Sequence, residues 1–275
     1  MLSVNTNVGA LIALEKLNAT ASQLQKAQNI LSTGLAVSSA QDNGAVWAIA
    51  QNERATASSL DAVKSSLQTG QSILDVANSA GSTVSDLLTQ MKEKALAASD
   101  TSLDSNSRSA LNNDFIALRN QITSTVNNAD FNGVNLLNGS VTQITSLANA
   151  NGTSVLTTLA QNLTLGTGGI ISITATQSIG TVTLAGTAIT AVSTSLTKVD
   201  NALATLGTSS QALQTHLTFV SNLQDTLNVG IGNLVNADLA KESATLQALQ
   251  TKQQLGIQAL SIANSSSSAL LGLFR

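Results

Sequence analysis

The chain has 275 residues, of which 10% are charged and 2% aromatic, and it contains no cysteine and no proline. An ordinary soluble protein has roughly 25% charged residues and about 5% proline. The lack of cysteine excludes a disulfide scaffold, a thiolate metal site and a cysteine nucleophile. Twelve basic against fifteen acidic residues give a net charge of −3. This balance argues against nucleic-acid binding, which needs a basic surface.

The single histidine, His216, leaves little room for enzymatic chemistry. A zinc site of the HExxH type needs two histidines. A Ser-His-Asp triad is formally possible, but His216 lies in an amphipathic helical pattern without a nucleophile elbow, so we interpret it as a structural or surface residue of a helix. We therefore expect no catalytic residue, cofactor or metal.

Neither a membrane-spanning segment nor a cleavable signal peptide is predicted. No apolar run reaches 18 residues, and the N-terminus lacks a basic region. We therefore expect no membrane insertion. A cytoplasmic protein and a protein exported without cleavage would both look like this.

Apolar residues at alternating spacings of three and four predict helices over the N-terminal part of the chain. The first helical seam starts at Ala10, is broken by Gln28, and ends before turn residues at Gly34 and Asp42. Its leucines are Leu14, Leu17, Leu24, Leu31 and Leu35. A longer helix is predicted over 46–95, with core residues Leu60, Val63, Leu67, Leu74, Val84 and Leu88. A third helix, capped by Asp104 or Ser105, carries Leu111, Phe115, Leu118 and Ile122.

The middle of the chain, 141–190, has a different pattern. It is rich in Ser, Thr, Asn and Gly and contains no charged residue. Two β-branched runs at 169–177 and 180–186 predict a hairpin or small sheet. Its hydroxyls are candidates for O-linked sugar, although Thr also suits strands. The candidate sites are Thr153, Ser154, Thr167 and, just beyond it, Ser193.

Helical spacing returns over 196–234, with core residues Leu203, Leu213, Leu217 and Leu227. After Asn236-Ala237-Asp238 the seam shifts register and continues through Leu239, Leu246, Leu249, Leu260 and Leu273. The fold class expected is mainly α: an elongated antiparallel helical bundle or coiled coil built from both chain ends, with a small central β-hairpin or sheet.

The apolar seams differ between the outer and the inner helices of this bundle. The outermost seams contain Gln28, Glu242, Gln253 and Gly256, so the outer helices are expected to order only against other copies of the chain. The predicted domains are a terminal assembly domain, 1–42 with 236–275; a bundle core, 43–140 with 191–235; and a surface insert, 141–190.

Three segments resemble bacterial flagellin. Segment 31–55 is similar to the family's junction between helices, and FNGVNLLNG at 131–139 to the turn after its third helix. Segment 236–264 resembles the family's C-terminal signature. The residues that carry the first and last matches are Gly34, Leu35, Ser39, Ala40, Asp42, Ala48, Ile49, Ala50, Asp238, Ala240, Glu242, Gln253, Gln254, Gly256, Leu260, Ala263 and Asn264. The similarity covers about 1–140 and 190–275.

The resemblance implies a non-enzymatic subunit that self-polymerises into the flagellar filament, the propeller for swimming. It implies secretion through the flagellar export machinery with a chaperone, and an extracellular location. The expected partners are other copies, paralogous flagellins, and the filament cap and hook-junction proteins. Terminal helices would build an inner tube, the bundle core an outer tube, and the insert the exposed face.

The alternatives to this function are a hook–filament junction protein, an enzyme in the insert and a secreted coiled-coil adhesin. A hook–filament junction protein would use the same terminal helices. An enzyme in the insert is disfavoured because 141–190 contains no His, Asp or Glu. A secreted coiled-coil adhesin would not need matching signatures at both ends.

Overall fold

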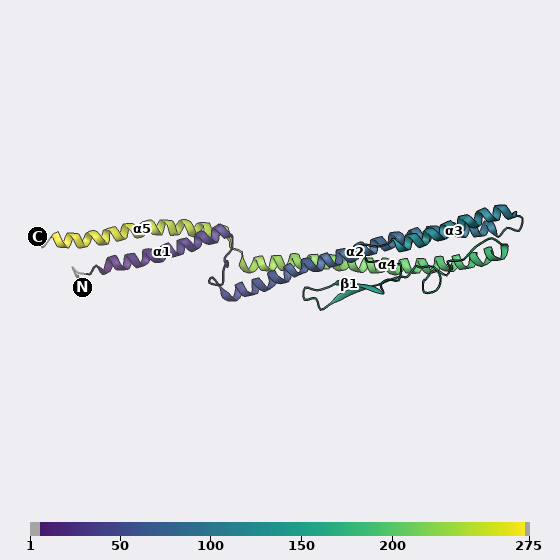
Figure 1. The fold of residues 1–275 in the computed structure, drawn as a ribbon. Coiled ribbons are helices and arrows are strands. Elements are labelled where there is room, and N and C mark those ends of the chain that lie inside the picture. Colours follow the sequence, from purple (N-terminus) through teal and green to yellow (C-terminus); the bar gives the residue numbers. More distant parts are fainter. Residues whose placement is uncertain (1–5, 273–275) are drawn as a thin grey trace. The chain divides into compact units, whose positions relative to one another are not determined.

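The computed structural model describes the backbone of residues 6–272 and the side chains of residues 6–265. In this range the chain forms five helices and one two-stranded sheet (Figure 1). In chain order the elements are α1 (Val8–Thr33), α2 (Gly44–Ala98), α3 (Ser105–Asn127), β1 (Gln143–Leu147), β2 (Val155–Leu159), α4 (Val182–Val235) and α5 (Leu239–Gly272). The predicted class, a mainly helical bundle with a small central sheet, is confirmed. None of the helices in the described range has the length and apolarity needed to cross a membrane.

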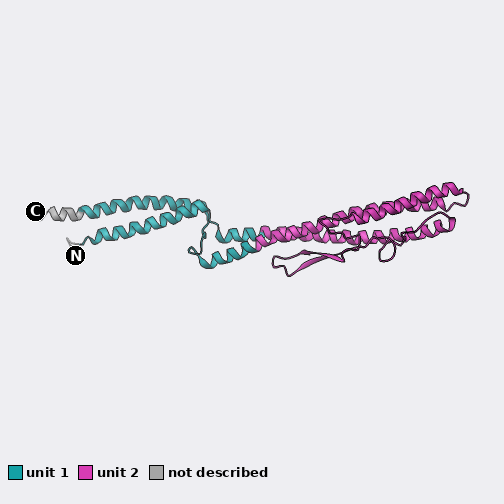
Figure 2. Ribbon diagram, in the orientation of Figure 1, with its two compact units in different colours: residues 1–55, 226–275 teal, residues 56–225 magenta. Residues whose placement is uncertain are grey.

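The chain divides into two compact units (Figure 2). The first, residues 1–55 with 226–275, contains α1, α5, the start of α2 and the end of α4. The second, residues 56–225, contains the rest of α2 and α4 together with α3 and the sheet. Each unit therefore combines segments from both halves of the chain.

In the second unit α2 lies antiparallel to both α4 and α3 (Figure 1). Gln71 Nε2 on α2 donates to Ser210 Oγ on α4 at 2.6 Å. Nearer the other end of α2, Lys94 Nζ lies 2.7 Å from the Asp114 carboxylate on α3. These polar pairs border a seam of buried apolar side chains that runs along the full second-unit part of α2.

The structure buries most of the core residues named from the sequence. The buried ones are Leu60, Val63, Leu67, Leu74, Val84, Leu88, Phe115, Ile122 and Leu213. The half-buried ones are Leu111, Leu118, Leu203, Leu217 and Leu227. On α4 some of the buried positions belong instead to small residues, such as Ser195 and Ala202, and others to Val199 and Leu206. Small residues allow two helix backbones to approach closely, and the leucines then flank the contact.

The turn between α2 and α3 is held by two side chains. Asp104 Oδ1 accepts from the backbone N–H groups of Asn106 and Ser107 at 2.8 and 3.0 Å. Of the two predicted caps, Asp104 is therefore the N-cap of α3. The Arg108 guanidinium donates to the Ala98 carbonyl at 2.9 Å. Together they satisfy polar backbone groups that a helix end leaves open.

The predicted strands at 169–177 and 180–186 are wrong. The hairpin lies earlier, where β1 pairs antiparallel with β2 in the register Gln143↔Leu159. Residues 182–186 begin α4, because Ala185, Ala188 and Val192 share one buried helical face. Packing against the bundle has therefore overridden the β propensity of this run. The signal in the sequence was Asn151-Gly152, an Asn-Gly pair typical of turns that lies between 143–147 and 155–159.

The hairpin is fixed to the helices of its unit by polar contacts. The Leu147 N–H donates to Ser66 Oγ on α2 at 3.0 Å, and His216 Nε2 on α4 lies 2.8 Å from the Ala148 carbonyl oxygen. The insert also contributes fully buried apolar residues to the core, among them Leu163, Ile171, Ile173 and Ile179. The middle of the chain is thus partly a surface and partly a component of the second unit's core.

Candidate assembly surface

The terminal helices α1 and α5 pack side by side in antiparallel order within the first unit (Figure 1). At the end near the termini, Asn7 Nδ2 donates to the Ala263 carbonyl at 2.8 Å. Further along, Gly256 faces Leu17, whose Cδ1 would lie 3.2 Å from a Cβ added at this glycine. Gly256, which looked like a weak point of the seam, therefore lets the two helices approach closely.

Burial between α1 and α5 is sparse. Thr20 and Ala27 are the buried residues described for α1, and Leu249 is the one described for α5. Gln28 is exposed, so it does not break the seam as predicted; the buried position is Ala27, one residue earlier. Of the other predicted assembly leucines, the half-buried ones are Leu17, Leu24, Leu31, Leu35, Leu246 and Leu260. Leu14 and Leu239 are exposed, and Leu273 lies outside the described residues.

Large apolar side chains instead face outward on this pair. We call them the outer apolar stripe: Val8, Leu11, Ile12, Leu14, Leu255, Ile257 and Ile262. Their exposed fractions run from 44% for Leu14 to 69% for Ile262. Segments 8–14 and 253–265, which carry the stripe, contain no charged residue. Residues two apart on a helix, such as Leu255 and Ile257, point about 200° apart, so these side chains cover more than one face of the pair. Large apolar side chains left exposed in this number mark an interaction surface in a soluble protein.

The connection from α1 to α2 and the connection from α4 to α5 are joined by backbone hydrogen bonds. The Ala36 N–H donates to the Val235 carbonyl at 2.7 Å, and the Ala237 N–H donates to the Gly34 carbonyl at 2.9 Å. Beneath them, Leu35, Val37 and Val46 pack against a small core of Ala50, Ile231 and Val235. The connection is thus an ordered part of the first unit.

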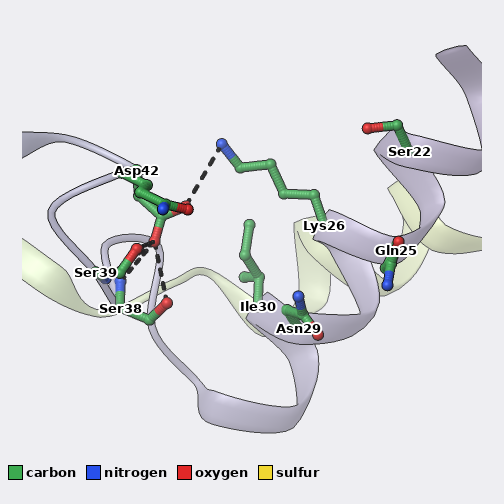
Figure 3. A pocket seen from close by; sticks show the side chains of 9 residues that line it. Ser22, Gln25, Lys26, Asn29, Ile30, Ser38, Ser39 and Asp42 are labelled. Carbon is green, nitrogen blue, oxygen red and sulfur yellow. Dashed lines mark hydrogen bonds and ion pairs between the residues drawn. The ribbon is translucent and has the colours of Figure 1, made fainter.

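Asp42 organises the longer connection, residues 34–43 (Figure 3). Its Oδ2 accepts from the backbone N–H and the hydroxyl of both Ser38 and Ser39, at 3.0 to 3.1 Å. Lys26 Nζ on α1 lies 3.9 Å from Asp42 Oδ1. The Ser38 hydroxyl, followed by that of Ser39, lowers the pKa of the Asp42 carboxyl. The ionised carboxylate therefore anchors the connection next to α1.

The candidate sugar sites lie in three different places. Thr153 and Ser154 are exposed in the loop of the hairpin, and Thr167 is exposed in the next loop. Ser193 is half-buried on α4. The first three hydroxyls are accessible to a modifying enzyme, whereas Ser193 is partly covered.

Two family models match the chain. One, the bacterial flagellin N-terminal helical region, matches residues 4–142, and the other, the bacterial flagellin C-terminal helical region, matches residues 189–274. The chain belongs to the bacterial flagellin family. Flagellin FljO of Caulobacter vibrioides is 58% identical, over 99% of this chain and 98% of its own length. A flagellin of Brucella melitensis is 36% identical over the full length of both chains.

This flagellin is a structural subunit of the bacterial flagellar filament. A putative flagellar hook-associated protein from Vibrio parahaemolyticus shares its fold, with a TM-score of 0.57, 16% identity, and coverage of 71% of this chain and 100% of that one. That identity shows the fold alone, and nothing in the comparisons favours the hook-junction alternative. Homologous flagellins form the filament, an extracellular appendage, and the family is a structural one.

Proposed function

We propose that this flagellin polymerises with other copies of itself mainly through the terminal pair, α1 and α5. The outer apolar stripe carries the proposal. Seven large apolar side chains face water in a segment that has no charge, and covering them with a neighbouring subunit would gain roughly 25 cal/mol per Å² of apolar area. In this arrangement the terminal pair forms an inner tube and the bundle of the second unit an outer tube.

A filament requires contacts of a particular kind. Helical polymers form when one surface of a subunit binds a different surface of the next, so that the contacts never close. The stripe lies on both helices of the pair. Because few side chains are buried between these helices within one chain, contacts with neighbouring subunits would add most of the burial that stabilises them. The predicted roles of the assembly leucines follow from this arrangement, with Leu249 at the centre of the pair.

The other expected partners follow from filament growth outside the cell. We propose that the chain leaves through the flagellar export machinery, escorted by a chaperone, and assembles between the hook-junction proteins and the filament cap. Paralogous flagellins of one organism are among its relatives, which supports copolymerisation. We also propose O-linked sugar on the exposed hydroxyls Thr153, Ser154 and Thr167. An intact mass equal to that of the bare polypeptide, from filaments sheared off cells, would contradict the sugar proposal.

A polymerisation assay with matched variants tests the assembly proposal. Wild-type chain should form filaments visible by electron microscopy. Ile12→Asp should prevent them, because it places a charge in the stripe that assembly would bury. Asn18→Asp, on an exposed polar position of the same helix, is the control and should polymerise. Normal filaments from Ile12→Asp, or none from wild type, would overturn the proposal.

A further inference from the structure

A groove opens between the start of α1 and the part of α5 around Leu260. We call it the terminal groove; its volume is about 410 Å³. It is lined by Thr6, Asn7, Ala10, Leu11, Leu14, Leu260 and Asn264. None of these side chains is charged, and Leu11 and Leu14 are 56% and 44% exposed. The groove therefore presents apolar walls to water.

One side chain links the two walls of the groove. Asn7 caps α1, because its Oδ1 accepts from the Ala10 N–H at 3.0 Å. The same side chain donates through Nδ2 to the Ala263 carbonyl on α5 at 2.8 Å. One residue thus ties both sides of the groove together when α1 and α5 are paired.

The C-terminal residues of the same chain cannot fill this groove. Helix α5 continues to Gly272, twelve residues beyond Leu260, which at 1.5 Å per residue is roughly 18 Å further along the axis. Phe274 is two residues beyond Gly272, and two extended residues reach at most about 7 Å. A chain of two residues is therefore too short to reach from Gly272 back to Leu260.

We propose that the terminal groove binds residues 270–274 of a second copy of the chain. This segment reads Leu-Leu-Gly-Leu-Phe, which is uncharged and apolar like the walls of the groove. Tail and groove are different surfaces of one subunit, so the contact can repeat from one subunit to the next, as a filament requires. The inference rests on the proposed function, and it names one specific contact within it.

Engineered cysteines test the contact directly, because the natural chain has none and background cross-linking is absent. Equal amounts of Leu14→Cys and Phe274→Cys chains are polymerised together and then oxidised. A disulfide forms when the two Cα atoms are about 4.4–6.8 Å apart, so a covalent dimer joining positions 14 and 274 is expected. Lys16→Cys replaces Leu14→Cys in the control mixture; it lies about 200° around the helix from position 14 and should give little dimer.

A variant without a new cysteine measures the energetic share of the tail. Phe274→Ser should raise the critical concentration for polymerisation roughly tenfold or more, as expected for losing a buried Phe side chain. The melting of the isolated subunit should not change.

The outcomes separate this inference from the proposed function. Filaments that form without the 14–274 dimer overturn the tail contact and leave the function standing, whereas wild-type chain that never polymerises overturns both. The chain's own first residues are the competing occupant. If a Leu2→Cys, Leu14→Cys double variant forms an intrachain disulfide in filaments, that segment fills the groove and the proposed contact is wrong.

Discussion

The pairs α2–α4 and α1–α5 are both antiparallel pairs of long helices, yet they are packed very differently. Along α2 in the second unit, buried residues recur at nearly every seam position from Leu60 to Ala98. On α1 the buried residues are Thr20 and Ala27, and large apolar side chains point outward. The first pair has the core of a protein that folds alone. We propose that the second is completed when neighbouring subunits cover its exposed apolar side chains.

The sharpest way to break this comparison is a charge at the buried centre of the terminal pair. Leu249→Asp should abolish filament formation, because the carboxylate would be buried in the assembled inner tube without a partner. The thermal unfolding of the second unit should be unchanged. Gln250→Asp, at an exposed position next to it, should still polymerise. Filaments of normal length from Leu249→Asp would show that the pair is not the assembly element.

The opposite result is expected in the second unit. Leu88 is fully buried, and Leu88→Ala should lower the free energy of unfolding by about 2–5 kcal/mol through the cavity it leaves. Leu96→Ala on the same helix removes a side chain that is 64% exposed and should change this free energy by less than about 0.5 kcal/mol. Urea unfolding followed by circular dichroism measures both. Equal effects of the two substitutions would remove the distinction between seam and surface on α2.

Limited proteolysis of the free subunit tests the same difference between the two helix pairs. Ordering each residue costs roughly 1–2 kcal/mol of backbone entropy, and the sparse burial of α1 and α5 offsets little of it. A protease should therefore trim segments 1–42 and 236–275 from the free subunit and leave a helical core of about 45–235. In filaments the same segments should be protected. Mass spectrometry of the fragments decides the point, and equal resistance of free ends and core would contradict the expected difference.

The smallest expected effect is on how the stability of the chain depends on pH. The Ser107 hydroxyl and N–H groups at the start of α3 lower the pKa of Asp104 below its ordinary value of 3.8. A lowered pKa means that the stabilisation by the carboxylate is complete above the ordinary value and is lost as the pH falls below it. Asp104→Asn keeps an N-cap acceptor but cannot titrate. The difference in melting temperature between wild type and this variant should shrink in acid; a constant difference would exclude this role of Asp104.

Much of the fold could be predicted because helical periodicity is a local property of sequence. The seam through Leu60, Leu67, Leu74 and Leu88 indicated α2, and the polar residues Asp104 and Ser105 indicated where α3 starts. The family could be recognised from short motifs at both ends. Among the proposed assembly residues, the alternating spacing located Leu249 but misjudged Gln28, because a shift of one residue around a helix changes which side chain faces the partner.

The sequence by itself determined the helices, the absence of cysteine chemistry and the resemblance to flagellin, since these depend on composition, spacing and motif. Only the tertiary structure decided which β-branched run becomes helix and which becomes hairpin. Residues 182–186 are helical because α4 buries Ala185 and Ala188 on one face, and burial outweighs a propensity worth about 1 kcal/mol. The tertiary structure also decided that Leu11, Leu14, Leu255 and Ile262 face water. A linear pattern gives the spacing of apolar residues around a helix, whereas the packing of two helices determines which of those residues remain for a neighbour.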